Sequence, residues 1–215
     1  MLSFPAQNWD KALSTTRVQL RGYNKAFGRV ASEINPRLYL SDYWTARDAE
    51  KLAELGITHV ISVIDLKPDI PEVIPHDQRL HIPIVDNSDA DIREHLDTTT
   101  AFIASAFAEN ETNKVLVHCM QGISRSATVV CAYLVATTSL TSSGSIAHVQ
   151  SLRGIVCPNM GFRRQLDDYA TQFVKLKKCP SQISIPAAFR LSGGIIARIK
   201  SFKSTDGLEK AKSIS

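Results

Sequence analysis

Residues 114–127 read Lys114-Val115-Leu116-Val117-His118-Cys119-Met120-Gln121-Gly122-Ile123-Ser124-Arg125-Ser126-Ala127. The stretch opens with a β-branched apolar run, Lys114 to Val117, which is typical of a buried strand. A tight polar loop follows. The next segment, Ala127 to Ala136, is apolar nearly all round and therefore indicates a buried central helix. The sequence thus predicts a strand, a loop and a helix in direct succession.

Strand and helix patterns alternate on both sides of this stretch. Toward the N-terminus, we expect strands at 37–40, 58–64 and 79–84 and helices at 46–55 and from 91 to about 110. Toward the C-terminus, helical patterns cover 146–152 and 161–176, and Ser143 and Ser145 are candidate caps of the first of these helices. Residues 1–33 show no sustained period, and we interpret them as an N-terminal extension.

The basic charge of the chain is concentrated at its C-terminal end. Residues 179–215 contain six Lys or Arg and two Asp or Glu, a net charge of +4 that equals the excess of the whole chain. The preceding residues therefore balance to zero, and their charges do not favour a nucleic-acid partner. We expect residues 179–215 to form a basic, flexible tail.

The composition, 44% hydrophobic and 21% charged, is that of a globular protein. The longest apolar stretch, 127–136, is half the length that a bilayer requires, and the first ten residues do not resemble a signal peptide, so we expect neither membrane insertion nor secretion. Without export, the four cysteines should be reduced thiols that form no disulfide and no zinc site. Cys131 fits a small core hydrophobe, whereas the role of Cys157 stays open. The cysteines are Cys119, Cys131, Cys157 and Cys179.

The loop between the predicted strand and helix has the residues of an anion site. A cysteine at this position points its thiol at backbone N–H groups and at the positive end of a helix, which predicts a lowered pKa for Cys119 and a cradle for a phosphate-like dianion. The fork of Arg125 can hold two oxygens of that anion, Gly122 permits the turn, and the Ser126 hydroxyl can steady the sulfur as it leaves. The predicted binding residues are Met120, Gln121, Gly122, Ile123, Ser124 and Arg125.

A thiolate beside such a cradle favours in-line attack on phosphorus. The attack gives a phosphocysteine that water hydrolyses, and the reaction needs no metal and no cofactor. Departure of the substrate oxygen requires a proton donor.

These residues resemble the signature of the cysteine-dependent protein tyrosine phosphatases, His-Cys, five residues, Arg-Ser. The fuller form, Val117 to Thr128 with Ala132-Tyr133-Leu134 after it, is similar to the dual-specificity branch. Three further stretches agree, and together they cover about residues 34–178, the length of a bare catalytic domain. The resemblance implies an α/β fold, a mainly parallel sheet flanked by helices, with the phosphate loop after a central strand. The three stretches are 38–41, 55–61 and 158–166.

The resemblance also implies roles for residues outside the loop. The general acid of this family lies on a loop before the cysteine, and matching Pro83 and the end of that loop places it at Asp86. Val85 stands where the family often has an acidic residue, and the spacing from Asp86 to Cys119 is slightly long, so Asp89 is an alternative acid. Asp91 fits a helix cap better. Asn159 would tie down the phosphate loop, and His118 would orient the cysteine backbone without transferring a proton.

The leading hypothesis is a cytoplasmic or nuclear phosphatase that acts on phosphotyrosine and phosphoserine or phosphothreonine in a phosphorylated protein. The chain resembles the small atypical members that lack a docking domain. A second hypothesis is a phosphatase for a phosphoinositide, a glycan or an RNA 5′ end. Met120 and Gln121 count against the lipid, because relatives acting on highly charged lipid phosphates often carry lysines there. A phosphate-binding adaptor without turnover is a third hypothesis.

Overall fold

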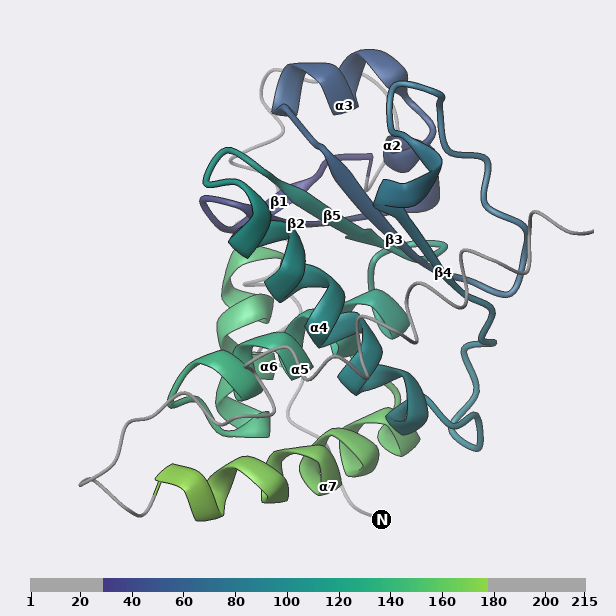
Figure 1. Ribbon diagram of the computed structural model, residues 1–215. Helices are drawn as coiled ribbons and strands as arrows, with labels where there is room; N and C mark the ends of the chain where they lie inside the picture. Colours follow the sequence, from purple (N-terminus) through teal and green to yellow (C-terminus); the bar gives the residue numbers. More distant parts are fainter. Residues whose placement is uncertain (1–28, 178–215) are drawn as a thin grey trace, which may run out of the picture. The chain divides into compact units, whose positions relative to one another are not determined.

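The computed structural model describes residues 29–177, which form a five-stranded sheet with helices on both faces (Figure 1). The strand order is β1-β2-β5-β3-β4; β1 pairs antiparallel with β2 and the other three pairings are parallel. This arrangement confirms the expected mainly parallel α/β fold. The strands are β1 (Ser32–Asn35), β2 (Leu38–Ser41), β3 (His59–Val63), β4 (Arg79–Ile82) and β5 (Val115–His118).

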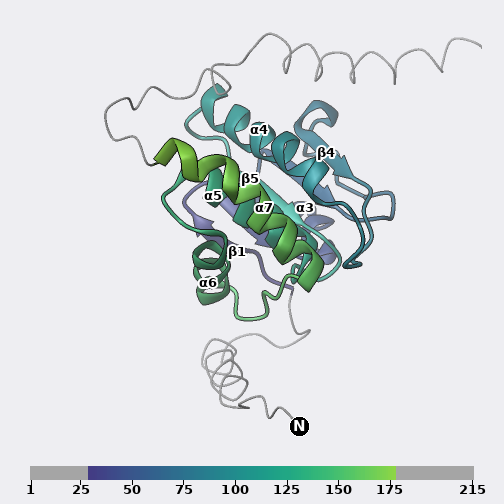
Figure 2. The ribbon, with the colours of Figure 1, turned by 90° about the horizontal axis from the view of Figure 1, so that it is seen from below.

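The helices divide between the two faces of the sheet. The short helices α2 (Tyr43–Ala46) and α3 (Ala49–Leu55) cover one face. Four longer helices cover the other, and seen from that side α7 crosses over α5 with α4 and α6 to either side (Figure 2). These are α4 (Arg93–Glu109), α5 (Arg125–Thr137), α6 (Ser142–Leu152) and α7 (Met160–Lys177); a 3-10 turn, His76–Gln78, precedes β4.

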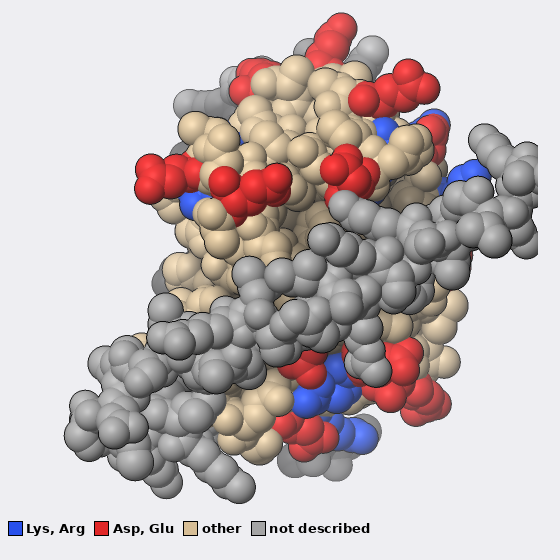
Figure 3. Space-filling model, viewed as in Figure 1, with Lys and Arg blue, Asp and Glu red and all other residues tan. Residues whose placement is uncertain are grey.

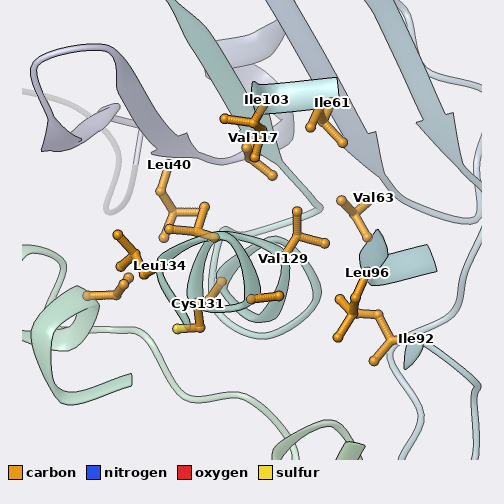
Figure 4. Packing of buried hydrophobic residues seen from close by; sticks show 14 of the residues in the cluster. Leu40, Ile61, Val63, Ile92, Leu96, Ile103, Val117, Val129, Cys131 and Leu134 are labelled. Carbon is orange, nitrogen blue, oxygen red and sulfur yellow. The ribbon is translucent and has the colours of Figure 1, made fainter. Parts of the chain in front are cut away.

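The strands bury both faces, which explains their nearly continuous apolar sequences. Tyr39, Val60 and Leu116 belong to the cluster with Ala46 of α2 and Leu52 of α3. The alternate strand positions pack instead around α5 (Figure 4). Helix α5 is apolar nearly all round because it lies between the sheet and α7 (Figure 2). Burying one such aliphatic side chain completely stabilises the folded state by about 1.5–3 kcal/mol relative to leaving it exposed. The alternate positions are Leu38, Leu40, Ile61, Val63, Val115 and Val117.

Several element boundaries differ from the sequence expectations. The helix expected at 46–55 begins later, as α3 at Ala49, because the Asp48 side chain accepts from Lys51 N (3.1 Å) and caps the helix. Residue 46 is instead the last residue of the separate short helix α2, which ends before the turn at Arg47. The cap of α6 is Thr141, which accepts from Gly144 N at 3.0 Å, and not Ser143 or Ser145. Strand β1 was not predicted, since its four residues include a single apolar side chain and show no strand pattern.

Two expected segments fall mainly outside the described residues. The basic tail at 179–215 lies wholly outside them, as do residues 1–28 of the expected N-terminal extension. Strand β1 spans the boundary expected between the extension and the catalytic domain. Within residues 29–177, no helix is both long and apolar enough to cross a membrane. The surface visible in Figure 3 carries mostly acidic side chains with a few basic ones above, and a mixed group of acidic and basic ones below.

Candidate active site

The loop at residues 119–124 connects the middle strand of the sheet, β5, to the first turn of α5. Because β2, β3 and β4 run parallel to β5, the segments that follow all four strands meet at one edge of the sheet. Asp42 follows β2, Asp65 follows β3 and Asp86 follows β4. The topology therefore collects acidic residues from distant parts of the sequence around the cysteine loop.

The carbonyl groups of the loop point away from its centre. All five carbonyls of residues 120–124 accept hydrogen bonds from outside the loop. In order along the loop, the donors are Tyr43 N at 3.2 Å, Arg153 Nη2 at 3.0 Å, Arg153 Nε at 3.0 Å, Cys157 N at 2.9 Å and Thr128 N at 2.9 Å.

The N–H groups of the loop consequently point inward. In a planar trans peptide the N–H of one residue points opposite to the C=O of the residue before it, so outward carbonyls at 120–124 turn the N–H groups of 121–125 toward the centre. The Gly122 N–H shows this directly, because it donates to Cys119 Sγ at 3.2 Å. A ring of inward N–H groups at the start of a helix is an anion cradle.

Gly122 is required by the shape of this loop. Its φ is +70°, in the left-handed region, and a Cβ there would lie 2.5 Å from Ser41 O and 2.8 Å from Arg153 Nη2. Both the conformation and the close approach therefore exclude a side chain.

Cys119 lies at the centre of the cradle and is 1% exposed. Burial alone would raise the pKa of the Cys119 thiol, but hydrogen bonds from the Ser126 hydroxyl and N–H outweigh burial, together with the charge of Arg125 and the Gly122 N–H, and the pKa is lowered. Ser126 Oγ lies 3.1 Å from the sulfur. The same groups that favour a thiolate also favour a bound oxyanion.

Arg125 reaches back from the start of α5 into the same site and is only 6% exposed. Its Nη1 donates to Asp65 Oδ1 at 2.9 Å and to Ile84 O at 3.1 Å. Its Nε is buried without a hydrogen-bond partner, and the nearby Asp86 Oδ2 is 3.6 Å away. A buried guanidinium with an unpaired N–H is a donor available to an anion.

The structure places the two candidate acids differently. Asp86 contacts the cysteine loop, since its Oδ1 accepts from Ser124 Oγ at 2.8 Å and from Asn159 Nδ2 at 2.9 Å. Asp89 is exposed, and its hydrogen bond is a local one from its N–H to Asn87 Oδ1 at 3.1 Å. The Asp91 side chain accepts from Glu94 N at 3.2 Å, as a cap of α4 would.

Asn159 joins the acid loop, the cysteine loop and α7. Besides its bond to Asp86, its backbone N–H donates to Ser124 Oγ at 3.2 Å, and its Oδ1 accepts from Phe162 N at 2.9 Å in the first turn of α7. Asn159 therefore holds Asp86 through its side chain and Ser124 through its backbone N–H.

His118 lies beneath the loop, fully buried. Burial, the largest cause, lowers the pKa of His118 to about 4, so the ring is neutral at neutral pH. Its Nδ1 lies 3.3 Å from Cys119 O and its Nε2 lies 2.7 Å from Ser62 Oγ. A carbonyl oxygen can only accept, so Nδ1 carries the proton and Nε2 accepts from the Ser62 hydroxyl. The ring thus contacts the backbone of the cysteine, not its sulfur.

Sequence reasoning missed two charged residues of the site, Asp65 and Arg153. Arg153 is 6% exposed, and besides the two loop carbonyls it donates from Nη1 to Val30 O at 2.8 Å. Burial lowers the pKa of Arg153, and Asp42 and Cys119 partly offset that effect. Nothing in the sequence distinguishes either residue from a surface charge, because their partners are 31 or more positions away.

The other described cysteines differ from Cys119. Burial raises the pKa of Cys131 to about 12, so this residue of α5 is a neutral thiol in the core (Figure 4). Cys157 is exposed, and its backbone contacts the loop. Within residues 29–177, no group of three or more His, Cys, Asp or Glu is arranged to hold a metal ion.

Comparison with known proteins identifies the family. The model of the dual specificity phosphatase catalytic domain matches residues 38–172. The tyrosine-protein phosphatase yvh1 of Schizosaccharomyces pombe is 36% identical over 138 residues, which make up 64% of this chain and 41% of that protein. Dual specificity protein phosphatase 22 of Mus musculus is 34% identical over 142 residues, which make up 66% of this chain and 74% of that protein.

A solved structure has the same fold. The human tyrosine phosphatase-like serine/threonine/tyrosine-interacting protein superposes with a TM-score of 0.62 at 33% identity, over 68% of this chain and 99% of its own. The aligned region spans less than half of the S. pombe protein named above. Since the family model matches more than half of this chain and includes the whole cysteine loop, the chain belongs to the dual specificity phosphatase family by its catalytic domain.

Proposed function

We propose that this chain is a protein phosphatase that hydrolyses phosphotyrosine and phosphoserine or phosphothreonine through a phosphocysteine intermediate. One observation carries the proposal. Cys119 has a lowered pKa and lies within a ring of inward N–H groups, beside a buried Arg125 whose Nε has no hydrogen-bond partner. A nucleophilic thiolate and unpaired donors in one place are complementary to a phosphate group under attack.

In the first step, Cys119 Sγ attacks phosphorus while the bond from phosphorus to the substrate oxygen breaks. The loop N–H groups and Arg125 hold the non-bridging oxygens, whose charge they stabilise. The leaving oxygen takes a proton from Asp86. We assign that proton to Oδ2, because Oδ1 already accepts hydrogen bonds from Ser124 and Asn159. Oδ2 also lies toward Arg125, 3.6 Å from its Nε.

In the second step, a water oxygen attacks phosphorus and gives its proton to the Asp86 carboxylate, which is now ionised. The sulfur–phosphorus bond breaks, inorganic phosphate forms, and the thiolate is restored. The Ser126 hydroxyl, 3.1 Å from the sulfur, stabilises the departing thiolate.

The substrate class rests on the family and on the relatives. Both named relatives carry a protein phosphatase name: one is named a tyrosine-protein phosphatase and the other a dual specificity protein phosphatase. We place the protein in the cytoplasm or the nucleus, where reducing conditions keep a reactive thiol such as Cys119 free.

The test is phosphate release without metal, with chelator present, from matched phosphotyrosyl, phosphoseryl and phosphothreonyl peptides, a phosphoinositide and an RNA 5′-triphosphate. Wild type, Cys119→Ser and Cys157→Ser are compared. We expect release from all three peptides, abolished in Cys119→Ser. Release should be retained in Cys157→Ser, because that side chain is exposed and contacts the loop through its backbone.

Other outcomes would redirect the proposal. Release from the lipid or the RNA but not from peptides would retain the thiolate route and change the substrate. Peptide binding without any release would indicate the adaptor, a possibility given weight by the solved neighbour whose name is phosphatase-like. Full activity of Cys119→Ser would refute the phosphocysteine.

A further inference from the structure

We propose that Asp65 is a positioning residue that anchors one nitrogen of Arg125, so that the opposite edge of the guanidinium faces the phosphate of the substrate. The inference rests on the proposed function, since it concerns how that phosphate is bound. Asp65 follows β3 and lies at the rim of the site, with 45% of its side chain exposed.

The contacts of Arg125 divide its fork into an anchored part and a free part. Nη1 has two N–H bonds, and they are used by Asp65 Oδ1 at 2.9 Å and Ile84 O at 3.1 Å. Because the guanidinium is planar, two acceptors on one nitrogen fix the plane of the whole group. Nε has no hydrogen-bond partner, and within residues 29–177 none is formed by Nη2 either. The edge made by Nε and Nη2 is the one that binds two oxygens of a phosphate.

The backbone that carries Asp65 is itself held firmly. Ile64 is fully buried, its N–H donates to Ile82 O at 3.0 Å, and its carbonyl lies 2.8 Å from His81 Nε2. The Asp65 carboxylate is therefore presented from a fixed point at the end of β3. A fixed Asp65 carboxylate restricts the Arg125 side chain before the ligand binds. The side chain then loses less conformational entropy on binding.

Charge alone predicts the opposite effect. A carboxylate next to an anion site repels the anion, so its removal should tighten anion binding. Because the Asp65 side chain is about half exposed, water screens its repulsion of the anion. For the same reason the Asp65–Arg125 ion pair contributes little to the stability of the fold. The two interpretations therefore differ in the sign of the change that follows loss of Asp65.

The experiment measures binding of tungstate, a phosphate-like oxyanion, by calorimetry to the full-length Cys119→Ser protein and to the same protein with each substitution. We expect Asp65→Ala to raise the tungstate dissociation constant about tenfold, a change of about 1.4 kcal/mol. Asp65→Asn should stay within about threefold of its parent, because an amide oxygen still accepts from Nη1. The matched control is Asp69→Ala, which removes an exposed carboxylate of the same segment that pairs with Arg47.

In the active enzyme, Asp65→Ala should raise the KM for a small aryl phosphate more than it lowers kcat, and Asp65→Asn should restore the KM. Equal or tighter tungstate binding in both Asp65 variants would overturn the positioning role. If Asp65→Ala does not fold, a large loss of tungstate affinity in Asp65→Asn would overturn it as well, because that variant keeps the acceptor. Absence of tungstate binding by the parent would instead contradict the proposed function itself.

Discussion

Arg153 Nε donates to the carbonyl of Gly122 at 3.0 Å, so a side chain between α6 and α7 holds the backbone of the cysteine loop. The same guanidinium donates to Gln121 O and to Val30 O, and it therefore ties the loop to the segment before β1. A loop whose N–H groups must face inward depends on such contacts, because each carbonyl held outward turns the next N–H inward.

Replacing Arg153 by methionine should therefore disturb the site chemically as well as structurally. We expect kcat/KM to fall by about tenfold or more. The free energy of unfolding should fall by about 2–4 kcal/mol, because the buried carbonyls lose their charged donor. The pKa of Cys119 should rise, which would shift the pH profile of its alkylation by iodoacetate upward.

The matched control is Arg164→Met, which removes an exposed arginine on α7 and should change none of the three quantities. Alkylation is measured with Cys157 and Cys179 replaced by serine, so that Cys119 is the reactive thiol followed. If Arg153→Met is destabilised but its pH profile of Cys119 alkylation is unchanged, Arg153 stabilises the fold without affecting the pKa of Cys119.

Asp86→Asn should slow substrates with poor leaving groups by about a hundredfold and affect good leaving groups much less. The asparagine oxygen can still accept from Ser124 and Asn159, so the loop should keep its position while losing the proton. The measurement is kcat/KM for a series of aryl phosphates of increasing leaving-group pKa. Asp89→Asn should leave the dependence of kcat/KM on leaving-group pKa unchanged. A steeper dependence in Asp89→Asn, and not in Asp86→Asn, would assign the general acid to Asp89 instead.

The position of the acid loop also depends on Gly161. A Cβ on Gly161 would lie 1.8 Å from Ser88 O, a contact that requires the backbone of the acid loop to move. Gly161→Ala should therefore reduce turnover of poor leaving groups, because Asp86 is two residues from the displaced segment. Gly154→Ala is the control, since a Cβ there meets no atom within 4 Å. Identical kinetics of the two variants would show that the loop adapts without moving Asp86.

His118 should make the fold sensitive to acid. Its pKa is about 4 in the folded state against 6.5 for an ordinary histidine, so the neutral ring stabilises the fold above pH 6.5 and this contribution is lost as the pH falls to about 4. The loss attributable to this group is about 3 kcal/mol. We expect a His118→Asn protein to be less stable at neutral pH but to lose less of its stability between pH 6.5 and 4. The measurement is the free energy of unfolding by denaturant at several pH values between 6.5 and 4. An equal loss of this free energy in the two proteins would contradict the prediction.

The sequence by itself determined the parts of this protein that depend on neighbouring residues. The strand, loop and helix at 114–136 could be predicted because apolar runs of strand and helix type flank one tight loop, and both the lowered pKa of Cys119 and the reach of Arg125 follow from their spacing in that loop. The mainly parallel sheet followed from the family resemblance, and the alternation of strands and helices agreed with it.

Tertiary structure alone decided which distant charges meet at the loop. The register of β3, β4 and β5 brings Asp65 and Asp86 to Arg125 from 60 and 39 positions away. Of the two alternative acids, Asp86 contacts the cysteine loop, whereas the hydrogen bond of Asp89 is local. Arg153 was missed for the same reason. A buried arginine is stable only where several carbonyls converge on it, and that convergence is a property of packed elements that no local pattern of residues records.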